Sequence, residues 1–472
     1  MPPQQGQPHQ AMPHQAMPPQ QQAASAGMPP ASPQMMHVPV VETHKEGGEK
    51  ALPRIAIHAF CERPDSAGAL QATTQDWRMA RANLKIYMGG IAAAIEYYKN
   101  ESTPSLIIFE SSLRAPDLFE QLDKLASVCD SGTKVVMMGA TNDIRLYREL
   151  MDKGLSDYIV PPFQPLSLIR SISELFADPD KPFVGRVVAF FGAKGGVGSS
   201  TLAHNIAWGL ANGMGQETAL VDLDSSWGTT GLDFHFDNVQ GLEEALADHE
   251  RLDETLLDRI MVRHSEKLSI LPAAASLGTP APSSAESYEA LVSGVRSLSP
   301  LTILDMPHVW TEWSCDMIKR ADEIVITATP DLANLRNAKN LVDYLKAARP
   351  NDAAPLLIVN KTGVPKTAEI PVKDFAAAIG IQPAVVLPYE PIVYTEASNE
   401  GKMLSEISAA AQTFDGIMYL AHRLRTGSFP SPVSRKKGKL KKLAKKQKGG
   451  KDDNPEQGKA KSSLFSKMKK RK

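Results

Sequence analysis

Apolar residues along this chain occur in short continuous runs, separated by longer segments in which apolar positions recur every three or four residues. Such runs indicate strands buried on both faces, and the segments between them indicate helices. Earlier in the chain the predicted strands are 55–60, 106–109, 134–138 and 158–160, and helical patterns include 144–153 and 166–176. Later the predicted strands are 186–191, 218–221, 268–271, 301–304, 323–327, 356–359 and 384–387. This alternation predicts two α/β domains, a flavodoxin-like domain over 51–178 and a doubly wound parallel sheet over 184–428.

The two ends of the chain lack these patterns. Residues 1–50 are rich in Pro, Gln and Met, and residues 429–472 are rich in Ser, Pro, Gly and Lys. Segments of this composition bury too little apolar surface to form a core, so we expect both tails to be disordered. The histidines of the first tail are scattered among Gln and Pro, and we expect them to be solvated and not to bind a metal.

Charge is distributed very unevenly. Residues 435–472 contain 17 Lys and Arg residues against three acidic residues, so a net charge of −1 for the whole chain leaves −15 for the rest. Because contacts with phosphates need a positive surface, the folded part is not expected to bind nucleic acid, specifically or otherwise. Any polyanion should bind the tail.

The last residues of the basic tail would form a small amphipathic helix if they are helical. Leu464, Phe465 and Met468 then share one face, among lysines. Each Lys or Arg near an anionic membrane contributes about 1 kcal/mol, which would offset so small an apolar face. A peripheral membrane anchor, a solvated run and a non-specific nucleic-acid contact all remain open.

Cysteine content and hydropathy indicate the compartment. The chain has three widely spaced cysteines, and its N-terminus lacks the apolar core of a signal peptide. No stretch approaches the roughly 18 apolar residues of a membrane-spanning helix. We therefore expect a protein of the reducing cytosol, bound at most to a membrane surface.

The order and size of the first domain resemble the receiver domain of two-component signalling. A working receiver needs an acidic pair after its first strand, a phosphorylatable Asp after its third and a Lys after its last. Here the first strand leads into Cys61, Glu62 and Arg63, the third ends at Glu110, and Pro161 stands in place of the lysine. The resemblance implies a degenerate receiver that acts as a docking module. An unrelated flavodoxin-like fold remains the alternative.

A glycine-rich turn follows the strand predicted over 186–191. It comprises Lys194, Gly195, Gly196, Val197, Gly198, Ser199, Ser200 and Thr201, and a helix over 200–212 should follow. Glycines let backbone N–H groups converge on a phosphate at the start of a helix. The pattern GxxxxGK[ST] fails at Ala193 and at Ser199. A purely structural turn is the alternative, but the preceding strand and following helix favour a nucleotide site.

The segment KGGVGSST resembles the deviant P-loop of the MinD/ParA family. The resemblance implies ATP and Mg²⁺ as ligands, with Lys194 reaching the nucleotide of a partner in a homodimer. Further matches are similar to that family's other motifs. They imply Asp224 as the residue that orients the attacking water, Asp222, Asp305 and Ser200 near Mg²⁺, and Asn360, Lys361 and Pro388 at the base. Carboxylates at strand ends suit the positioning of metal and water in phosphoryl transfer.

Ser199 stands where that family has a lysine. A lysine ammonium against a phosphate at 4 Å contributes about 4 kcal/mol at an effective dielectric of 20 before desolvation, and a hydroxyl cannot replace it. Mg²⁺ and Lys194 could take over part of this role. We therefore expect ATP to bind weakly or only in a dimer, and any hydrolysis to be slow.

A degenerate receiver joined to a MinD-like domain resembles the CpaE/TadZ proteins of type IVb (Flp/Tad) pilus assembly. Residues 329–345 are similar to the segment after the fifth strand in those proteins. The resemblance implies a dimeric localisation factor at the cytoplasmic face of the inner membrane or the cell pole, which recruits the pilus machinery with its secretion ATPase. A nucleotide-independent scaffold remains open, as does, with less support, a ParA-type DNA-partitioning ATPase. A transcriptional response regulator fits worst, because the receiver lacks its chemistry.

Overall fold

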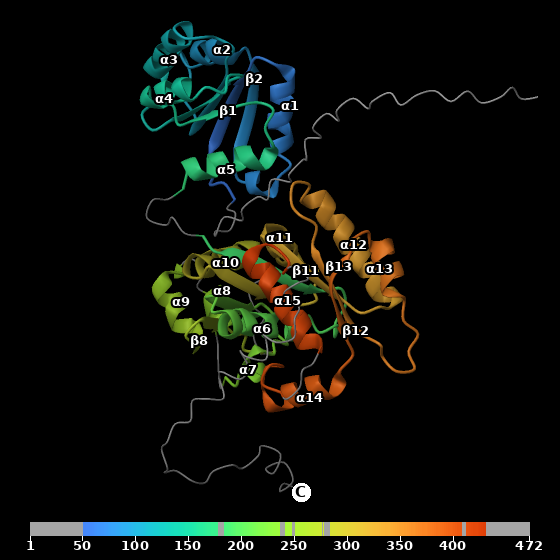
Figure 1. Cartoon of the computed structure of the whole chain (residues 1–472). Helices are drawn as coiled ribbons and strands as arrows, with labels where there is room; N and C mark the ends of the chain where they lie inside the picture. The colour runs from blue at the N-terminus through green and yellow to red at the C-terminus, as the bar shows by residue number, and fades with distance from the viewer. Residues whose placement is uncertain are drawn as a thin grey trace, which may run out of the picture. The chain divides into compact units, whose positions relative to one another are not determined.

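The computed structural model describes residues 51–177, 184–236, 241–247, 251–275, 277, 284–407 and 412–430. Both predicted tails lie outside these residues, apart from Phe429 and Pro430. Figure 1 shows the elements in chain order. They form two separate sheets, one built from residues 56–159 and the other from residues 186–388.

The first sheet has the strand order β2-β1-β3-β4-β5, and all neighbouring strands are parallel. This is the order of the flavodoxin-like fold. The strands are β1 (Ala56–Cys61), β2 (Asn83–Met88), β3 (Leu106–Glu110), β4 (Lys134–Met138) and β5 (Asp157–Ile159). The helices are α1 (Pro64–Thr73), η1 (Trp77–Met79), α2 (Gly90–Tyr97), α3 (Asp117–Val128), α4 (Ile144–Asp152) and α5 (Pro165–Leu175).

Alternate residues of the central strands enter two different cores. Ile57 and Ile108 pack with side chains of α1 and α5 on one face of the sheet. Phe60 and Phe109 pack with side chains of α2, α3 and α4 on the other face. Because successive side chains of a strand point to opposite faces, a strand covered on both sides must be apolar at every position. This is why the runs at 55–60 and 106–109 carry no polar alternation.

The second sheet has the order β13-β12-β11-β6-β10-β7-β9-β8 and is parallel except for β8, which is antiparallel to β9. Its strands are β6 (Arg186–Gly192), β7 (Thr218–Asp222), β8 (Val262–Ser265), β9 (Leu268–Leu271), β10 (Leu301–Asp305), β11 (Glu323–Ala328), β12 (Leu356–Thr362) and β13 (Pro383–Pro388). The strand order reverses at β6, which lies between β10 and β11. Ligands of doubly wound sheets bind at such a switch point, beyond the carboxyl ends of the strands.

Helices cover both faces of the second sheet, as the alternation along β6 requires. Val187, Ala189 and Phe191 pack with helices α8 to α13, whereas Val188 and Phe190 pack with α6 and α15. The helices are α6 (Ser199–Trp208), η2 (Gly209–Gly213), α7 (Thr230–Asp233), α8 (Gly241–Ala247), α9 (Glu254–Ile260), α10 (Ala285–Leu298), α11 (Glu312–Arg320), α12 (Leu332–Ala348), α13 (Val372–Ile379), α14 (Pro391–Glu400) and α15 (Gln412–Thr426). The α/β architecture predicted from the sequence is thus confirmed in both sheets.

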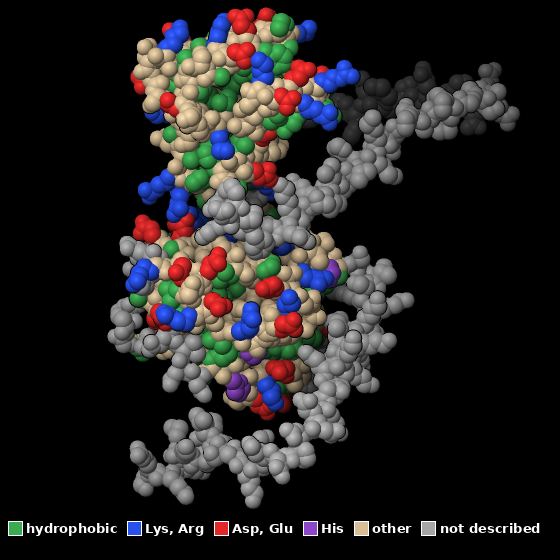
Figure 2. All heavy atoms as spheres, turned by 90° about the vertical axis from the view of Figure 1, so that its left-hand side faces the viewer, with side chains coloured by type: hydrophobic (Ala, Val, Ile, Leu, Met, Phe, Trp, Pro, Cys, Tyr) green, Lys and Arg blue, Asp and Glu red, His purple; other side chains and the backbone are tan. Residues whose placement is uncertain are grey.

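The surface charge and the hydropathy of the helices both bear on function. Acidic and basic side chains are interspersed among the described residues on the face that Figure 2 shows. Among the described helices, none combines the length and the apolar character that a membrane crossing requires.

Candidate functional site

The glycine-rich loop joins β6 to α6, at the switch point of the second sheet. Gly196 and Gly198 have φ values of +77° and +92°, which side-chain-bearing residues rarely adopt. A Cβ on Gly198 would lie 2.8 Å from Nδ2 of Asn360, whereas a Cβ on Gly195 would meet nothing within 4 Å. The backbone therefore turns sharply beside β12 and leaves open space on the side of Gly195.

Side chains from neighbouring elements hold the loop through its carbonyl oxygens. Asn337 on α12 donates to the carbonyl of Ala193 at 2.9 Å. Asn360 and Lys361, at the end of β12, donate to the carbonyls of Val197 at 2.8 Å and Gly196 at 2.7 Å. The sequence prediction placed Asn360 and Lys361 at the nucleotide base, and their contacts with the loop are an addition that the sequence did not indicate.

Ser199 begins α6 and is buried, with 9% of its surface exposed. Its Oγ is buried without a hydrogen-bond partner among the described residues. Lys194 is exposed. Its positive charge contributes to lowering the pKa of Asp331, although burial raises that pKa and hydrogen bonds from Asn334 and Thr329 act more strongly. Lys194 is therefore not held against the start of α6 in place of the missing lysine.

A cavity of about 380 Å³ lies beside the loop. Its lining combines loop and helix residues with the segment that follows β13, and includes Gly198, Thr201, Asn205, Asn360, Lys361 and Tyr389. This volume lies within the range of small-molecule sites. Pro388 is the last residue of β13 and pairs with Thr362, so the loop that it begins reaches the cavity while Pro388 itself is not part of the lining.

Asp222 and Asp305 end the neighbouring strands β7 and β10 and face each other in the strand register. Both are buried, with 0% and 2% of their surface exposed. Burial and the nearby charge of Asp305 raise the pKa of Asp222. The oxygen Oδ1 of Asp305 is buried without a hydrogen-bond partner among the described residues. The two predicted carboxylates thus lie next to each other at the carboxyl ends of their strands. Oδ1 of Asp305 is still able to accept a hydrogen bond.

Asp224 lies two residues beyond the end of β7 and is partly exposed. Its backbone N–H donates to Oδ1 of Asp222 at 3.0 Å, and its own Oδ1 accepts a hydrogen bond from the backbone N–H of Trp227 at 2.9 Å. These contacts close a tight turn that fixes both carboxylates. Asp224 keeps one side-chain oxygen beyond this turn, as a residue that orients water would require.

His204 is a member of this site that the sequence analysis missed. It lies on α6, fully buried, and its ring nitrogens face two carboxylates: Nδ1 is 2.7 Å from Asp233 and Nε2 is 3.2 Å from Asp305. Burial alone would lower the pKa of His204, but the hydrogen bonds and charges of Asp233 and Asp305 outweigh it and raise the pKa to about 10. The available signal was its spacing: His204 follows Ser200 by four residues, which places both on one face of a helix.

The first domain has a different acidic site. Glu110, at the end of β3, accepts hydrogen bonds from the backbone N–H groups of Glu62 and Arg63, from Nε of Arg63 and from Oγ of Ser66. Burial raises the pKa of Glu110, but these hydrogen bonds outweigh it and hold the pKa below its usual value. The carboxylate of Glu110, which stands where a working receiver has its phosphorylatable Asp, is therefore hydrogen-bonded through both oxygens within the domain.

Parts of the chain are similar to known proteins. The family model "AAA domain" matches residues 185–354. The chain is 26% identical over 257 residues to the septum site-determining protein MinD of Synechocystis sp., covering 52% of this chain and 92% of that protein. It is also 50% identical to a pilus assembly protein CpaE from Caulobacter crescentus, over 27% of this chain and 98% of the crystallised chain, with a TM-score of 0.27.

A second structure of this kind is a putative CpaE2 pilus assembly protein from Sinorhizobium meliloti. It is 35% identical over 26% of this chain and 99% of that chain, with a TM-score of 0.25. Over about a quarter of its length, the chain is thus of the CpaE type. The resemblance of this CpaE-type chain to CpaE/TadZ proteins, predicted from its motifs, is thereby confirmed, and so is the presence of a MinD/ParA-type ATPase domain.

Proposed function

We propose that this CpaE-type protein is an ATP-binding assembly and localisation factor for a type IVb pilus or a related secretion machine. The observation that carries the proposal is the loop at the end of β6, where glycine geometry, an open cavity and two strand-end carboxylates meet at the switch point of the sheet. Phosphates bind at such loops through backbone N–H groups and the positive end of the following helix. The relatives' part in pilus assembly supplies the cellular role.

The residues fit ATP with Mg²⁺. The buried Oγ of Ser199 and Oδ1 of Asp305 have no hydrogen-bond partner among the described residues, and a ligand would satisfy both. Ser200, Asp222 and Asp305 would hold Mg²⁺, which when bound neutralises charge on the phosphates. Gly195, Gly196, Val197, Gly198 and Thr201 would surround the phosphates, and the cavity beside Asn360 would take the base. Asp224 would orient a water molecule for in-line attack.

The chemistry is proposed to be weak. Ser199 places a neutral hydroxyl where a positive charge is needed, and the buried position leaves little bulk water to screen the phosphate charge. Lys194 is exposed, as a residue that completes the site of a second subunit would be. ATP would therefore bind best in a homodimer, and its turnover would be slow.

A nucleotide-independent scaffold is the second candidate, and the loss of the lysine at Ser199 favours it. Calorimetry with ATP and Mg²⁺, together with mass measurement of the oligomer, separates the two. Binding that depends on ATP and increases the dimer fraction supports the first proposal. Absence of any ATP binding up to millimolar concentration would leave the scaffold.

The remaining parts of the function concern surfaces. The first domain would act as a docking module, because its acidic site is internally satisfied by Arg63 and Ser66. The basic tail, which lies outside the described residues, would bind the anionic cytoplasmic face of the membrane. On the face that Figure 2 shows, acidic side chains lie among the basic ones, so this face offers no continuous positive surface for DNA.

A further inference from the structure

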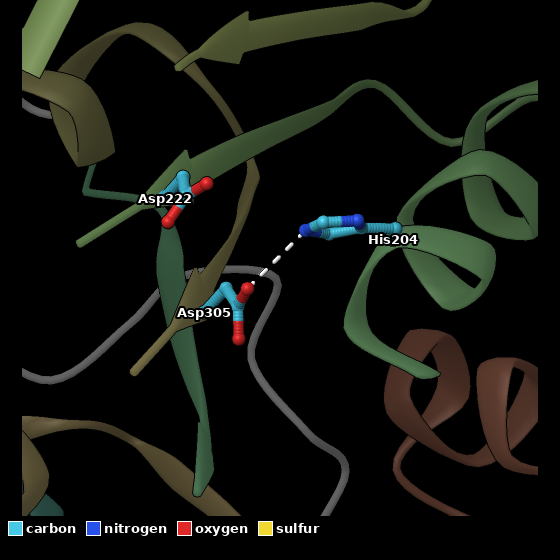
Figure 3. A group of neighbouring side chains, drawn as sticks. All are labelled: His204, Asp222 and Asp305. Atoms are coloured by element: carbon cyan, nitrogen blue, oxygen red, sulfur yellow. Dashed lines mark ion pairs between the residues drawn. The ribbon is translucent and has the colours of Figure 1, made fainter. Parts of the chain in front are cut away.

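Three side chains from three different elements meet beneath the start of α6. His204 comes from α6, Asp222 from β7 and Asp305 from β10, and their candidate ligand atoms all lie within 4.8 Å of one another. Figure 3 shows the imidazole and the two carboxylates converging on the same space. We propose that these residues form a binding site for one divalent transition-metal ion of the manganese class, which binds there in preference to Mg²⁺.

The donor atoms decide the class of metal. Mg²⁺ takes oxygen ligands almost exclusively, whereas divalent transition metals also accept an imidazole nitrogen, Mn²⁺ the most weakly of the series. The site offers one ring nitrogen and two carboxylates. A mixed set of this kind is typical of manganese, iron and cobalt. This inference refines the metal assignment of the proposed function, which rests on the two carboxylates alone.

Neighbouring residues orient each ligand. Asp233 lies 2.7 Å from Nδ1 of His204 and thereby turns Nε2 toward Asp305. Thr230 donates its hydroxyl to Oδ2 of Asp222. A carboxylate behind a ligating histidine is the usual arrangement at metal sites, since it fixes the ring and strengthens the nitrogen as a donor.

A second observation favours the binding of a cation at this site. Oδ1 of Asp305 is buried without a hydrogen-bond partner among the described residues. In addition, the carboxylates of Asp222, Asp233 and Asp305 surround a single imidazole. Buried carboxylates that exceed the positive charge around them are costly, and a divalent ion would balance them.

Metal binding at this site must also account for a proton. Both ring nitrogens of His204 face carboxylate oxygens, which only accept hydrogen bonds, so without metal each nitrogen carries a proton. The metal ion would replace the proton on Nε2, and one proton would pass to the solvent for each ion bound. Asp233, which contacts Nδ1 of His204, forms part of the lining of the cavity beside the loop.

The test uses the full chain, freed of metal with a chelator and titrated with Mn²⁺ alone or Mg²⁺ alone, without nucleotide. We expect one high-affinity Mn²⁺ ion per chain, bound at least tenfold more tightly than Mg²⁺, and a nitrogen coupling from histidine in pulsed electron paramagnetic resonance. In the His204→Gln variant the coupling should disappear, and Mn²⁺ affinity should fall about tenfold or more. In the control His422→Gln, a histidine on α15, both should stay unchanged.

Equal affinity for the two ions, or no histidine coupling in the unaltered chain, would overturn the proposal without any variant. A coupling that persists in His204→Gln would also overturn it, because the nitrogen would then come from another histidine, such as those of residues 1–50. These results are independent of ATP binding. A chain that binds ATP but shows no preference for Mn²⁺ refutes this inference and leaves the proposed function standing.

Discussion

The side-chain amide of Asn360 donates a hydrogen bond to the carbonyl oxygen of Val197 at 2.8 Å, so the end of β12 holds the glycine-rich loop in place. The neighbouring Lys361 does the same for Gly196. Both residues are ones that the family resemblance assigns to the nucleotide base. In the proposed ATP site, these contacts would link the residues at the base to the loop around the phosphates, so that a substitution at one should alter the other.

Gly198→Ala tests this contact. The new Cβ would lie 2.8 Å from Nδ2 of Asn360, and the φ of +92° disfavours any side chain. We expect ATP affinity to fall by about tenfold or more, since a left-handed conformation alone costs about 1–2 kcal/mol for alanine. Isothermal titration calorimetry with ATP and Mg²⁺ measures this affinity. Gly68→Ala in helix α1 of the first domain is the control, because a Cβ there would meet nothing within 4 Å, and it should bind ATP as the unaltered chain does. A similar loss in both variants would refute the role of the Asn360 contact.

Ser199→Lys should restore the missing charge. We expect ATP to bind about tenfold more tightly, a gain of about 1.4 kcal/mol, because part of the Coulombic attraction is spent on desolvating the ammonium group. Ser199→Ala should weaken ATP binding by about 1 kcal/mol, because the ligand would lose the hydrogen bond that the otherwise unpartnered Oγ offers. Unchanged ATP affinity in a folded Ser199→Lys protein would show that charge at this position does not limit binding.

His204 should make the stability of the metal-free protein depend on pH. Its pKa is about 10 in the folded chain against an ordinary value of 6.5, so its contribution is complete below pH 6.5 and is lost as pH rises toward 10. Between pH 7 and 9.5 the free energy of unfolding should fall, by at most about 1.4 kcal/mol per pH unit from this group. Urea denaturation with a chelator present measures the slope. The slope should be smaller in His204→Gln and unchanged in His422→Gln, and equal slopes in all three proteins would contradict the ion pairs.

Glu110→Gln should weaken the first domain. The amide would present N–H donors to some of the groups that now donate to the carboxylate, at a cost of about 1–3 kcal/mol for each buried group left without a partner. Hydrogen exchange of the β1 and β3 amides, followed by mass spectrometry, should become faster. Glu120→Gln removes an exposed ion pair with Lys124 and should have little effect. Because the pKa of Glu110 is lowered on folding, its contribution is present above about pH 4.5 and is lost on acidification below it.

Ending the chain after Pro430 should remove membrane binding. The deleted segment carries 17 of the 52 Lys and Arg residues but only three of the 53 acidic residues, and about 1 kcal/mol is gained for each basic residue near an anionic surface. Liposome flotation with anionic lipid should recover the full chain and not the shortened one. Neutral vesicles should recover neither. Equal flotation of both proteins would place the contact elsewhere, and DNA binding by the tail at the same salt concentration would favour the nucleic-acid alternative.

Much of the architecture was predictable because its strands are covered on both faces. A strand such as β3 is buried at every position, and its sequence is a continuous apolar run that ends at Glu110. Strands β2 and β8 were missed, and both lie at the edge of a sheet. Both strands have exposed positions with polar residues, so neither forms the continuous apolar run from which the other strands were predicted. Helix α6 was predicted to run to residue 212, but the structure gives its last turn a wider π-helical geometry over Gly209–Gly213.

The site was predictable only where one motif contains its members. Asp222 and Asp305 were placed from the strands that they end. His204 and Asp233 were not, since they belong to no pattern with the carboxylates along the chain and meet only after α6 packs against the sheet. Contacts between side chains that are distant in sequence depend on packing geometry, and neither periodicity nor composition encodes that geometry directly.

Helix α6 carries Ser200 at its first turn and His204 four residues later, about 6 Å along the axis. Because Ser200 and His204 lie on one continuous helix, a movement of its first turn would also move His204. An anion that draws the first turn forward would also alter the imidazole's position against Asp305, and an ion that pulls on the imidazole would reset the first turn. Thermodynamic reciprocity requires the two effects to be equal in free energy, so the affinity gained or lost by either ligand in the presence of the other should be the same.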